Sequence, residues 1–526
     1  MARINTNIPS LIAQRNLASA NTDLGVRLQR LATGLRLNRG ADDPAGLIAS
    51  ERLRANLRGI EQGVKNSERA SGVIATTEAS LSEVSELLNS IKSLVVEAAN
   101  TGGFSPDEVT ANQAQIDSAI DSITRISNTA SFADLRLLNG GLGYTLSGVN
   151  TTDITKTTVN SVQFLNRPNV QVDVEVIESA QQGTLYLRGD TTNAAVFTPT
   201  AAVNGEIPQT ATVRLGGPDG VQELTFISGT TLDQIVTAIN NLAASTGVQA
   251  ARVSATDITS GIRIFSVEHG SKPFVSIEKV GSSGVFLDQG MVRLINNGNP
   301  GTLDYNNPAI VELASRDTGK DVVALINGAL GTGRGLTISA KSSSLDIDLL
   351  LGASFASTVS GTPSTFRVTG GGSLYQLGPE VNASQQVNLG VQSIASTRLG
   401  GTLNTVPTGP PGTTDFQFLS SLKSGGPNAL SSGSFINASR IIDTSIDEVS
   451  SLRGRLGAFE RNTLDTNIRS LQAALENVTS ANSKIRDADF AAETSALTRA
   501  QVLSSAATST LAAANTSAQN VLQLLG

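Results

Sequence analysis

Heptad patterns of apolar residues occupy both ends of this chain and constrain its fold more than any other feature. At the front of the chain, apolar residues alternate in steps of three and four, as in a coiled-coil seam. They are Leu17, Leu24, Leu28, Leu31 and Leu35, with Asn21 as the one polar member. The same steps recur at Leu81, Val84, Leu88, Ile91, Val95 and Ala98. Such a seam needs a partner helix. Residues 44 to about 100 are predicted to form one helix of roughly 85 Å.

The last 80 or so residues carry matching patterns, free of Pro. One seam comprises Val449, Leu452, Leu456 and Phe459, and a second, in shifted phase, comprises Leu464, Ile468, Leu471, Leu475 and Val478. The final segment keeps the steps with mostly small residues, at Ala500, Ser504, Ala507, Leu511, Ala514, Ala518, Val521 and Leu525. Small residues let helices approach closely but bury little area each. We therefore expect this last helix to be weak alone.

Between the helical ends, residues of about 145 to 430 are rich in Thr, Ser and Gly and read as β-structure. The fold class predicted is mixed α and β and multi-domain, with a terminal coiled-coil core formed by both chain ends and a central β-rich insert. The predicted segments are an inner helix (1–40), a helical layer with a short β-hairpin (41–144), the insert (145–365) with a β-α-β-β unit (221–280), returning strands and a loop (366–433), a second helical layer (434–488) and a final inner helix (489–526).

Local signals define the helix boundaries at the front of the chain. In "SPDEV", Ser105 is an N-cap, Pro106 stands in the first turn and Glu108 completes a capping box. The following "FADLRLLNG" predicts a short strand that ends in an Asn-Gly turn.

The stretch "TGLRLNRGADDPAG" between the first two helices has three possible meanings. A phosphate loop would need a Lys and a hydroxyl that are missing here, and Asp42 and Asp43 lack further metal ligands nearby. A structural connector fits better: Gly40 permits a change of direction, Asp43 caps the next helix and Pro44 occupies its first position. Candidates for fixing the bend or meeting a neighbour are Gly34, Arg36, Asn38 and Arg39.

Composition excludes several functions. The chain of 526 residues has no Cys and a single His, His269, so Cys nucleophiles, thiolate metal sites and His-Glu-x-x-His chemistry are excluded. We read His269 as a solvated loop residue and expect no catalytic, cofactor or metal site. A net charge of −7 and a pI near 5.1 argue against nucleic-acid binding. No signal peptide and no membrane span are expected.

These end motifs resemble those of bacterial flagellin, over residues 1 to 143 and 366 to 526. The front carries "INTNIPSLIAQRNL" and "LATGLRLNRGADDPAG", and the back carries "ENVTSANSKIRDADFAAETS" and "QVLSSAATSTLAAAN". The resemblance implies a self-assembling, extracellular subunit of the flagellar filament, with terminal helices inside, the insert outside and no enzymatic activity. It also implies export unfolded through the type III apparatus, and as partners other copies, an export chaperone, the cap and hook-junction proteins, and sister flagellins.

One departure from the family concerns the flagellin-detecting Toll-like receptor. Recognised flagellins carry an Arg in the first long helix and a Glu in the "SPDEV" helix, where this chain has Ser90 and Gln115. Two alternatives to the filament subunit stay open: a hook–filament junction protein, and a flagellin with an enzymatic or adhesive outer domain.

Overall fold

The computed structural model describes residues 6–103, 105–164, 167–187, 198–199, 205–207, 210–253, 261–281, 291–294, 311–342, 344–359, 361–403 and 416–523. The chain forms two compact units. One comprises Met1–Ala70, Gln376–Gln386 and Arg461–Gly526, and the other comprises Ser71–Tyr375 and Val387–Glu460.

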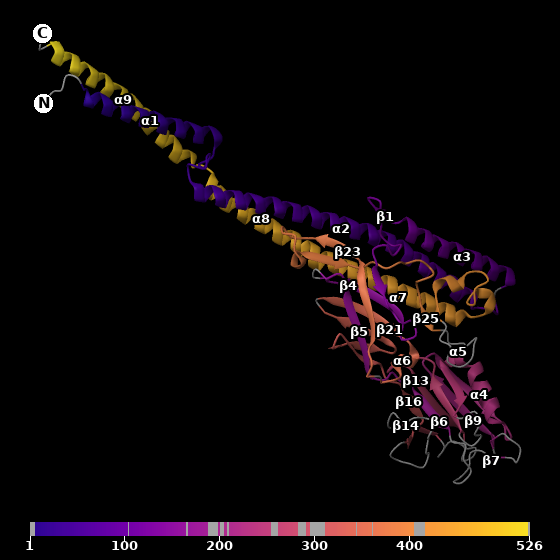
Figure 1. The fold of residues 1–526 in the computed structure, drawn as a ribbon. Helices are drawn as coiled ribbons and strands as arrows, with labels where there is room; N and C mark the ends of the chain where they lie inside the picture. Colours follow the sequence, from indigo (N-terminus) through magenta and orange to yellow (C-terminus); the bar gives the residue numbers. More distant parts are fainter. Residues whose placement is uncertain are drawn as a thin grey trace. The chain divides into compact units, whose positions relative to one another are not determined.

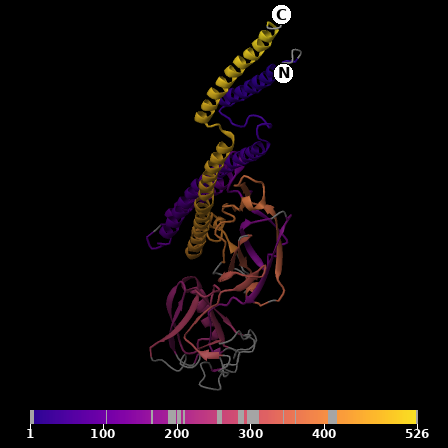
Figure 2. The same ribbon diagram turned by 90° about the vertical axis from the view of Figure 1, so that its left-hand side faces the viewer.

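The first unit is built from helices of both chain ends. Its elements are α1 (Ile8–Thr33), the first half of α2 (Pro44–Ala98), the 3-10 turn η3 (Ala383–Gln385), α8 (Asp465–Arg486) and α9 (Phe490–Gln523). Helices α1 and α9 lie side by side in both ribbon views (Figure 1, Figure 2). They run antiparallel, because Asn7 at the start of α1 contacts Ala514 whereas Arg27 near its end contacts Glu493.

Side chains and backbone conformation set the ends of these helices. Asn7 caps α1 by accepting a hydrogen bond from the Ser10 amide, and α1 ends at Gly34, which has a φ of 69°. Asp43 accepts from the Gly46 amide at 2.9 Å, which confirms it as the cap of α2. The long second helix is confirmed, since α2 runs without a break from Pro44 to Ala98.

In the second unit, the rest of α2 packs with α3 (Pro106–Thr129) and α7 (Phe435–Phe459). The predicted seam from Leu81 to Ala98 is confirmed as core, since each of its six residues is at most 2% exposed. The capping box of Ser105 and Glu108 is also confirmed.

The short strand predicted in "FADLRLLNG" belongs to a hairpin whose own turn lies earlier in the chain. Strands β1 (Ser131–Phe132) and β2 (Leu135–Arg136) are joined at Ala133 and Asp134, whose φ values are 47° and 67°. A two-residue hairpin turn with both φ positive matches the twist of the strands. The Asn139–Gly140 pair follows the hairpin.

The shift between the two C-terminal seams has a structural cause. The segment Glu460–Leu464 between α7 and α8 is a π-helix (η6). A π turn adds a residue per turn, which accounts for the five-residue step from Phe459 to Leu464 where a heptad has three or four. Both seams are confirmed as inward-facing: Val449, Leu452, Leu456, Leu464 and Leu471 are buried, and the others are half-buried.

Two antiparallel sheets enclose one apolar core of the insert. One has the order β18-β17-β5-β22-β3, and its strands are β3 (Tyr144–Ser147), β5 (Val170–Glu178), β17 (Val323–Ile326), β18 (Ala329–Leu330) and β22 (Ser364–Gly371). The other has the order β19-β20-β21-β4, with β4 (Ile154–Val162), β19 (Thr332–Arg334), β20 (Thr337–Lys341) and β21 (Leu345–Leu351). Alternate residues such as Val172, Val174 and Val176 fill the core. The short helix α6 (Ala353–Ala356) contributes Ala356.

A second core lies between another pair of sheets and a helix. The sheets are β10-β9-β13-β16 and β11-β12-β6-β14-β15, formed by β6 (Thr184–Leu187), β9 (Ala211–Gly217), β10 (Gly220–Phe226), β11 (Val248–Arg252), β12 (Ile262–Ser266), β13 (Phe274–Val280), β14 (Met291–Leu294), β15 (Val311–Leu313) and β16 (Arg316–Thr318). Helix α4 (Leu232–Asn241), followed by α5 (Ala243–Thr246), buries Leu232, Ile235 and Ile239. The predicted strand–helix–strand–strand order is confirmed.

The remaining elements are short. They are the pairs β7 (Thr198–Pro199) with β8 (Gly205–Glu206), β23 (Ser373–Gln376) with β24 (Gln386–Leu389) and β25 (Thr402–Leu403) with β26 (Phe416–Gln417), and the 3-10 turns η4 (Leu419–Leu422) and η5 (Leu430–Ser432). The predicted fold class, helical ends around a β-rich insert, is confirmed (Figure 1). Among the described residues, no helix is both long and apolar enough to span a bilayer.

His269 departs from its predicted environment. It lies in the loop after β12, but it is half-buried, and its Nδ1 has no hydrogen-bond partner among the described residues. Burial, assisted by the nearby positive charge of Arg263, lowers the pKa of His269 to about 4. The solvated reading of His269 was therefore wrong.

Candidate self-assembly site

The face of α9 toward α1 follows the predicted small-residue steps. Ala500 is 1% exposed, and Ser504, Ala507, Leu511 and Ala514 are half-buried. The predicted seam continues with Ala518, Val521 and Leu525, whose side chains lie outside the described residues. The part of this seam that is described thus lies against α1.

On α1, the positions of the predicted seam differ from one another. Leu17, Leu24 and Leu31 are half-buried, as is Leu35 just beyond the helix, whereas Leu28 is 49% exposed. Continuing the steps backward from Leu17 leads to Ala13 and Ser10, which are both buried and which the leucine pattern alone missed. The α1 face is therefore as rich in small residues at its start as the α9 face is.

Three hydrogen bonds between side chains or backbone fix the pairing of the two helices. Asn7 Nδ2 donates to the Ala514 carbonyl at 3.1 Å, and Ser10 Oγ donates to Asn515 Oδ1 at 2.8 Å. Ser504 Oγ donates to Asn21 Oδ1 at 2.8 Å, so the one polar member of the predicted seam binds a polar seam residue of the partner helix. Polar pairs at seam positions specify register.

A charged cluster closes the other end of this pair. Glu493 is only 8% exposed, and its Oε1 lies 3.2 Å from Arg27 Nη1 and 3.8 Å from Arg30 Nη1. Sequence reasoning missed this cluster. The signal was present, because Glu493 stands seven residues before Ala500 and so occupies the same heptad position.

The connector joins the two chain ends where both change direction. Leu35 forms an antiparallel bridge with Asp487, the Arg36 amide donates to the Arg486 carbonyl at 2.7 Å, and the Ala488 amide donates to the Gly34 carbonyl at 2.9 Å. Arg36 Nη2 also donates to the Ile485 carbonyl at 2.8 Å. The α1–α2 and α8–α9 breaks are thus held together by backbone pairing.

Within the connector, Asp42 organises the loop. Its Oδ2 accepts from the amides of Arg39 at 2.9 Å and Asn38 at 3.1 Å, and these bonds hold the pKa of Asp42 below its usual range. The Asn38 side chain donates to Thr33 Oγ1 and to the Leu35 carbonyl. Two backbone amides therefore already bind the Asp42 carboxylate. Within the described ranges, no cluster of three His, Cys, Asp or Glu residues could hold a metal ion.

Gly40 lies within the turn that the Asp42 amide closes by donating to the Arg39 carbonyl at 3.0 Å. Its φ is not positive, whereas Gly34 adopts the left-handed conformation, so the change of direction after α1 needs Gly34. Pro44 occupies the first position of α2, as expected.

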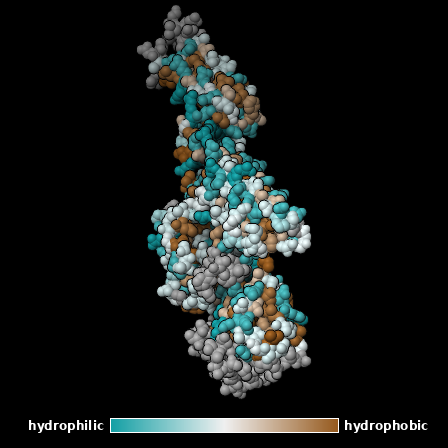
Figure 3. Space-filling view, turned by 90° about the vertical axis from the view of Figure 1, so that its right-hand side faces the viewer, coloured by the Kyte–Doolittle hydropathy of each residue, from teal (hydrophilic) through white to brown (hydrophobic). Residues whose placement is uncertain are grey.

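Large apolar side chains remain exposed around the terminal pair and the connector. They are Ile8, Leu11, Ile12 and Leu28 of α1, Ile48 of α2, and Phe490, Val502 and Leu503 of α9, each 46–63% exposed. Figure 3 shows apolar side chains gathered on the terminal helices, at the top of that view. Exposed large apolar side chains in this number on one helix pair favour an interaction site.

A terminal helix pair with a small-residue seam inside and apolar side chains outside is typical of a structural protein that assembles with further copies. Family models agree with this class. Residues 4–141 match the bacterial flagellin N-terminal helical region, residues 439–525 match the bacterial flagellin C-terminal helical region, and residues 212–267 match the flagellin hook IN motif.

Similar proteins extend over the whole chain. Flagellin of Salmonella typhimurium and B-type flagellin of Pseudomonas aeruginosa are each 28% identical, with 99% of both chains covered. Flagellin E of Vibrio cholerae is 39% identical over 26% of this chain and 36% of its own. Among solved structures, FliC from Burkholderia pseudomallei is 11% identical, with a TM-score of 0.22 and coverage of 75% of this chain and 99% of its own. The chain belongs to the bacterial flagellin family, and it is a subunit of the extracellular flagellar filament.

Ser90 and Gln115, at the positions where the family resemblance placed a receptor-binding Arg and Glu, are both exposed. Ser90 lies on α2 and Gln115 on α3. Their effect on receptor recognition stays a prediction.

Proposed function

We propose that the chain polymerises through the terminal pair of α1 and α9 and the connector, with neighbouring copies covering the apolar side chains that the single chain leaves exposed. The observation that supports this most is the exposure of Leu11, Phe490 and Val502, each above 50%, around a helix pair that buries few large residues of its own. Burial of this surface on assembly contributes about 25 cal/mol per Å².

The seam and connector residues have distinct roles in this proposal. Leu17, Leu24 and Leu31 with Ala507, Leu511 and Ala514 pair the two chain ends, and Ala518, Val521 and Leu525 extend that seam. Gly34, Arg36, Asn38, Asp42 and Asp43 hold the angle between the inner helices and the helical layer around them. The β-rich insert lies on the outside of the filament, and repeated head-to-tail contacts that do not close give a helical polymer.

Further partners belong to the same proposal. The chain is exported unfolded and added at the filament tip, with an export chaperone, the cap, hook-junction proteins and sister flagellins as partners, and it has no enzymatic role. Relatives that carry the name flagellin over 99% of both chains favour this role over that of a junction protein.

Electron microscopy of the concentrated protein tests the proposal. We expect long helical filaments that disappear when residues 490–526 are removed, because α1 then loses its partner. Filaments of normal length from the truncated chain would contradict the role given to the terminal pair.

A further inference from the structure

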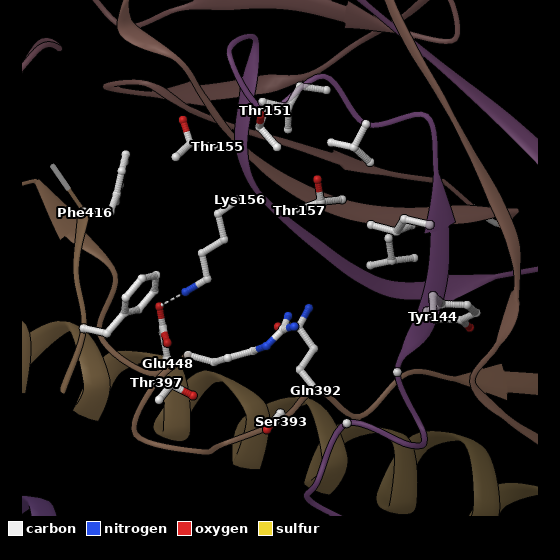
Figure 4. Close-up of a pocket in the computed structure, with 18 of the residues that line it drawn as sticks. Tyr144, Thr151, Thr155, Lys156, Thr157, Gln392, Ser393, Thr397, Phe416 and Glu448 are labelled. Atoms are coloured by element: carbon white, nitrogen blue, oxygen red, sulfur yellow. Dashed lines mark hydrogen bonds and ion pairs between the residues drawn. The ribbon is translucent and has the colours of Figure 1, made fainter. Parts of the chain in front are cut away.

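Two adjoining cavities lie beside α7 in the second unit. The larger has a volume of about 760 Å³ and the smaller about 460 Å³, and both are lined by Lys156 of β4, Gln392, Ser393 and Glu448 of α7. Lys156 and Glu448 form an ion pair at this shared wall. Figure 4 shows Lys156 extending across the cavity to Glu448, with Thr157, Gln392 and Ser393 around the open space. Two spaces of this size and arrangement can accept two or three linked rings of a ligand.

The smaller cavity has buried polar atoms that lack partners among the described residues. Asn160 is 3% exposed, and its Nδ2 donates to Asp346 at 3.0 Å and to Asp348 at 2.9 Å, while its Oδ1 accepts from none of these residues. The Nε and Nη1 groups of Arg455, which lines the same cavity, are also buried without an acceptor among the described residues. Buried groups of this kind are costly unless something satisfies them.

The charges in the smaller cavity balance. Its wall has three cations and three carboxylates, namely Lys156, Arg334 and Arg455 against Asp348, Asp447 and Glu448. Such a wall gives no excess charge that would attract an ion. Because an acceptor and donors are both left unpaired, the matching ligand must donate and accept hydrogen bonds, which hydroxyl groups do.

The larger cavity supplies apolar surface beside hydroxyl groups. Phe416 and Phe418 lie on one side, and Ile154 and Val159 belong to β4. Thr157, whose Oγ1 is buried without a partner among the described residues, lines this cavity as well. Aromatic rings pack against the C–H faces of sugar rings, while hydroxyl and amide groups bind the sugar hydroxyls.

We propose that these two cavities form one binding site for a neutral oligosaccharide. Asn160 Oδ1 accepts from a sugar hydroxyl, Arg455 donates to another, and Phe416 and Phe418 contact a ring face. No residue that lines these two cavities belongs to α1 or α9, so the site adds a glycan-binding activity to the filament subunit and does not depend on polymerisation.

Binding to the full-length, unpolymerised protein tests this. The probes are the neutral trisaccharides maltotriose, cellotriose and chitotriose, with trigalacturonate as the charged comparison, measured by saturation-transfer NMR and calorimetry. We expect at least one neutral trisaccharide to bind with a Kd of roughly 0.1–1 mM.

Two substitutions locate the site, and one serves as control. Arg455→Met is expected to weaken binding about tenfold, because a charged donor is lost. Thr157→Val has nearly the same shape and is expected to weaken binding several-fold while leaving the fold unchanged. Arg469→Met, at an exposed Arg of α8, is expected to bind as the unchanged protein does.

Three outcomes would overturn the proposal. They are no binding of any neutral trisaccharide at several millimolar, binding of trigalacturonate in preference to all three, or equal affinities in the folded Thr157→Val and Arg469→Met variants. Melting curves of each variant separate loss of the site from loss of the fold.

Discussion

Gly34 and Gly40 stand six residues apart in the connector, and only Gly34 has a positive φ, of 69°. A Cβ at Gly34 would meet no heavy atom within 4 Å, so the backbone conformation alone opposes a side chain there. A Cβ at Gly40 would make an ordinary contact with Leu47 at 3.6 Å.

The two glycines therefore make a matched test. Gly34→Ala is expected to destabilise the terminal region by roughly 1–2 kcal/mol, because an L-residue is strained in the left-handed region. Gly40→Ala is expected to be nearly neutral. The measurement is the temperature at which filaments dissociate. Equal effects of the two substitutions would contradict the inference that the left-handed conformation of Gly34 sets the bend.

The single His gives a pH dependence that can be assigned without ambiguity. Since burial lowers the pKa of His269 to about 4 from 6.5, the unfolded chain binds a proton at a higher pH than the folded chain does. The stability that His269 contributes is complete above pH 6.5 and is lost as the pH falls toward 4. The one imidazole resonance in an NMR titration should shift near pH 4, and a midpoint near 6.5 would contradict the burial.

Ser90 and Gln115, at the positions predicted to meet the receptor, are both exposed. Ser90→Arg with Gln115→Glu is expected to raise receptor signalling by the monomer, because charge-assisted pairs contribute roughly 1–3 kcal/mol each. The control is Asn89→Arg with Ala114→Glu, which introduces the same two charges one residue earlier in each helix, at positions that are also exposed. Strong signalling by the unchanged protein in a reporter assay, or no gain in the double variant, would refute the prediction.

At the scale of the elements, heptad spacing predicted most of the helices and their inward faces, since every residue from Leu81 to Ala98 in the seam is buried. The same spacing on α9 identified Ala500, Ser504 and Ala507 although they are small. The spacing also extends back to Glu493, but an ionised side chain argues against a buried seam position unless a partner is known, and its partner Arg27 is distant in the sequence.

Other elements depended on information that no local pattern holds. The bridge between Leu35 and Asp487 joins residues over 450 positions apart, and the cavities beside α7 combine β4 with a distant helix. The hairpin turn at Ala133 and Asp134 was missed because Ala is rarely left-handed and the pair lacks the Gly that usually marks such a turn. The π-helix was visible only as a shift of phase at Leu464.

The α9 seam can be tested with two adjacent alanines. Ala514→Glu would bury an unpaired charge in the closely packed face of α9, which is energetically costly. We therefore expect polymerisation to be abolished, while the melting temperature of residues 45–485 stays nearly unchanged. Ala513→Glu, at an exposed position of the same helix, is the control for helix propensity and charge. Long filaments of the Ala514→Glu variant in electron micrographs would show that this helix is not a packed core element.

For the whole molecule, the small area buried between α1 and α9 predicts that ordering of the chain ends accompanies assembly. As free monomer, residues 1 to about 40 and 490 to 526 are expected to be largely disordered, because the pair cannot offset about 1–2 kcal/mol of backbone entropy per residue. Hydrogen exchange on monomer and filament measures this. Protection of residues 511–523 in the monomer as strong as in the filament would contradict it.

The backbone pairing of Gly34 and Arg36 with Arg486 and Ala488 also bears on how incomplete chains are treated. A ribosome makes the first strand of this pairing some 450 residues before the second. A chain that ends early, or whose last residues are removed by a protease, has an α1 without α9 to pack against. The amides of its connector are then exposed to water. If the terminal pair carries polymerisation as proposed, we expect such a chain to be left out of the filament, because it lacks the α9 that pairs with α1.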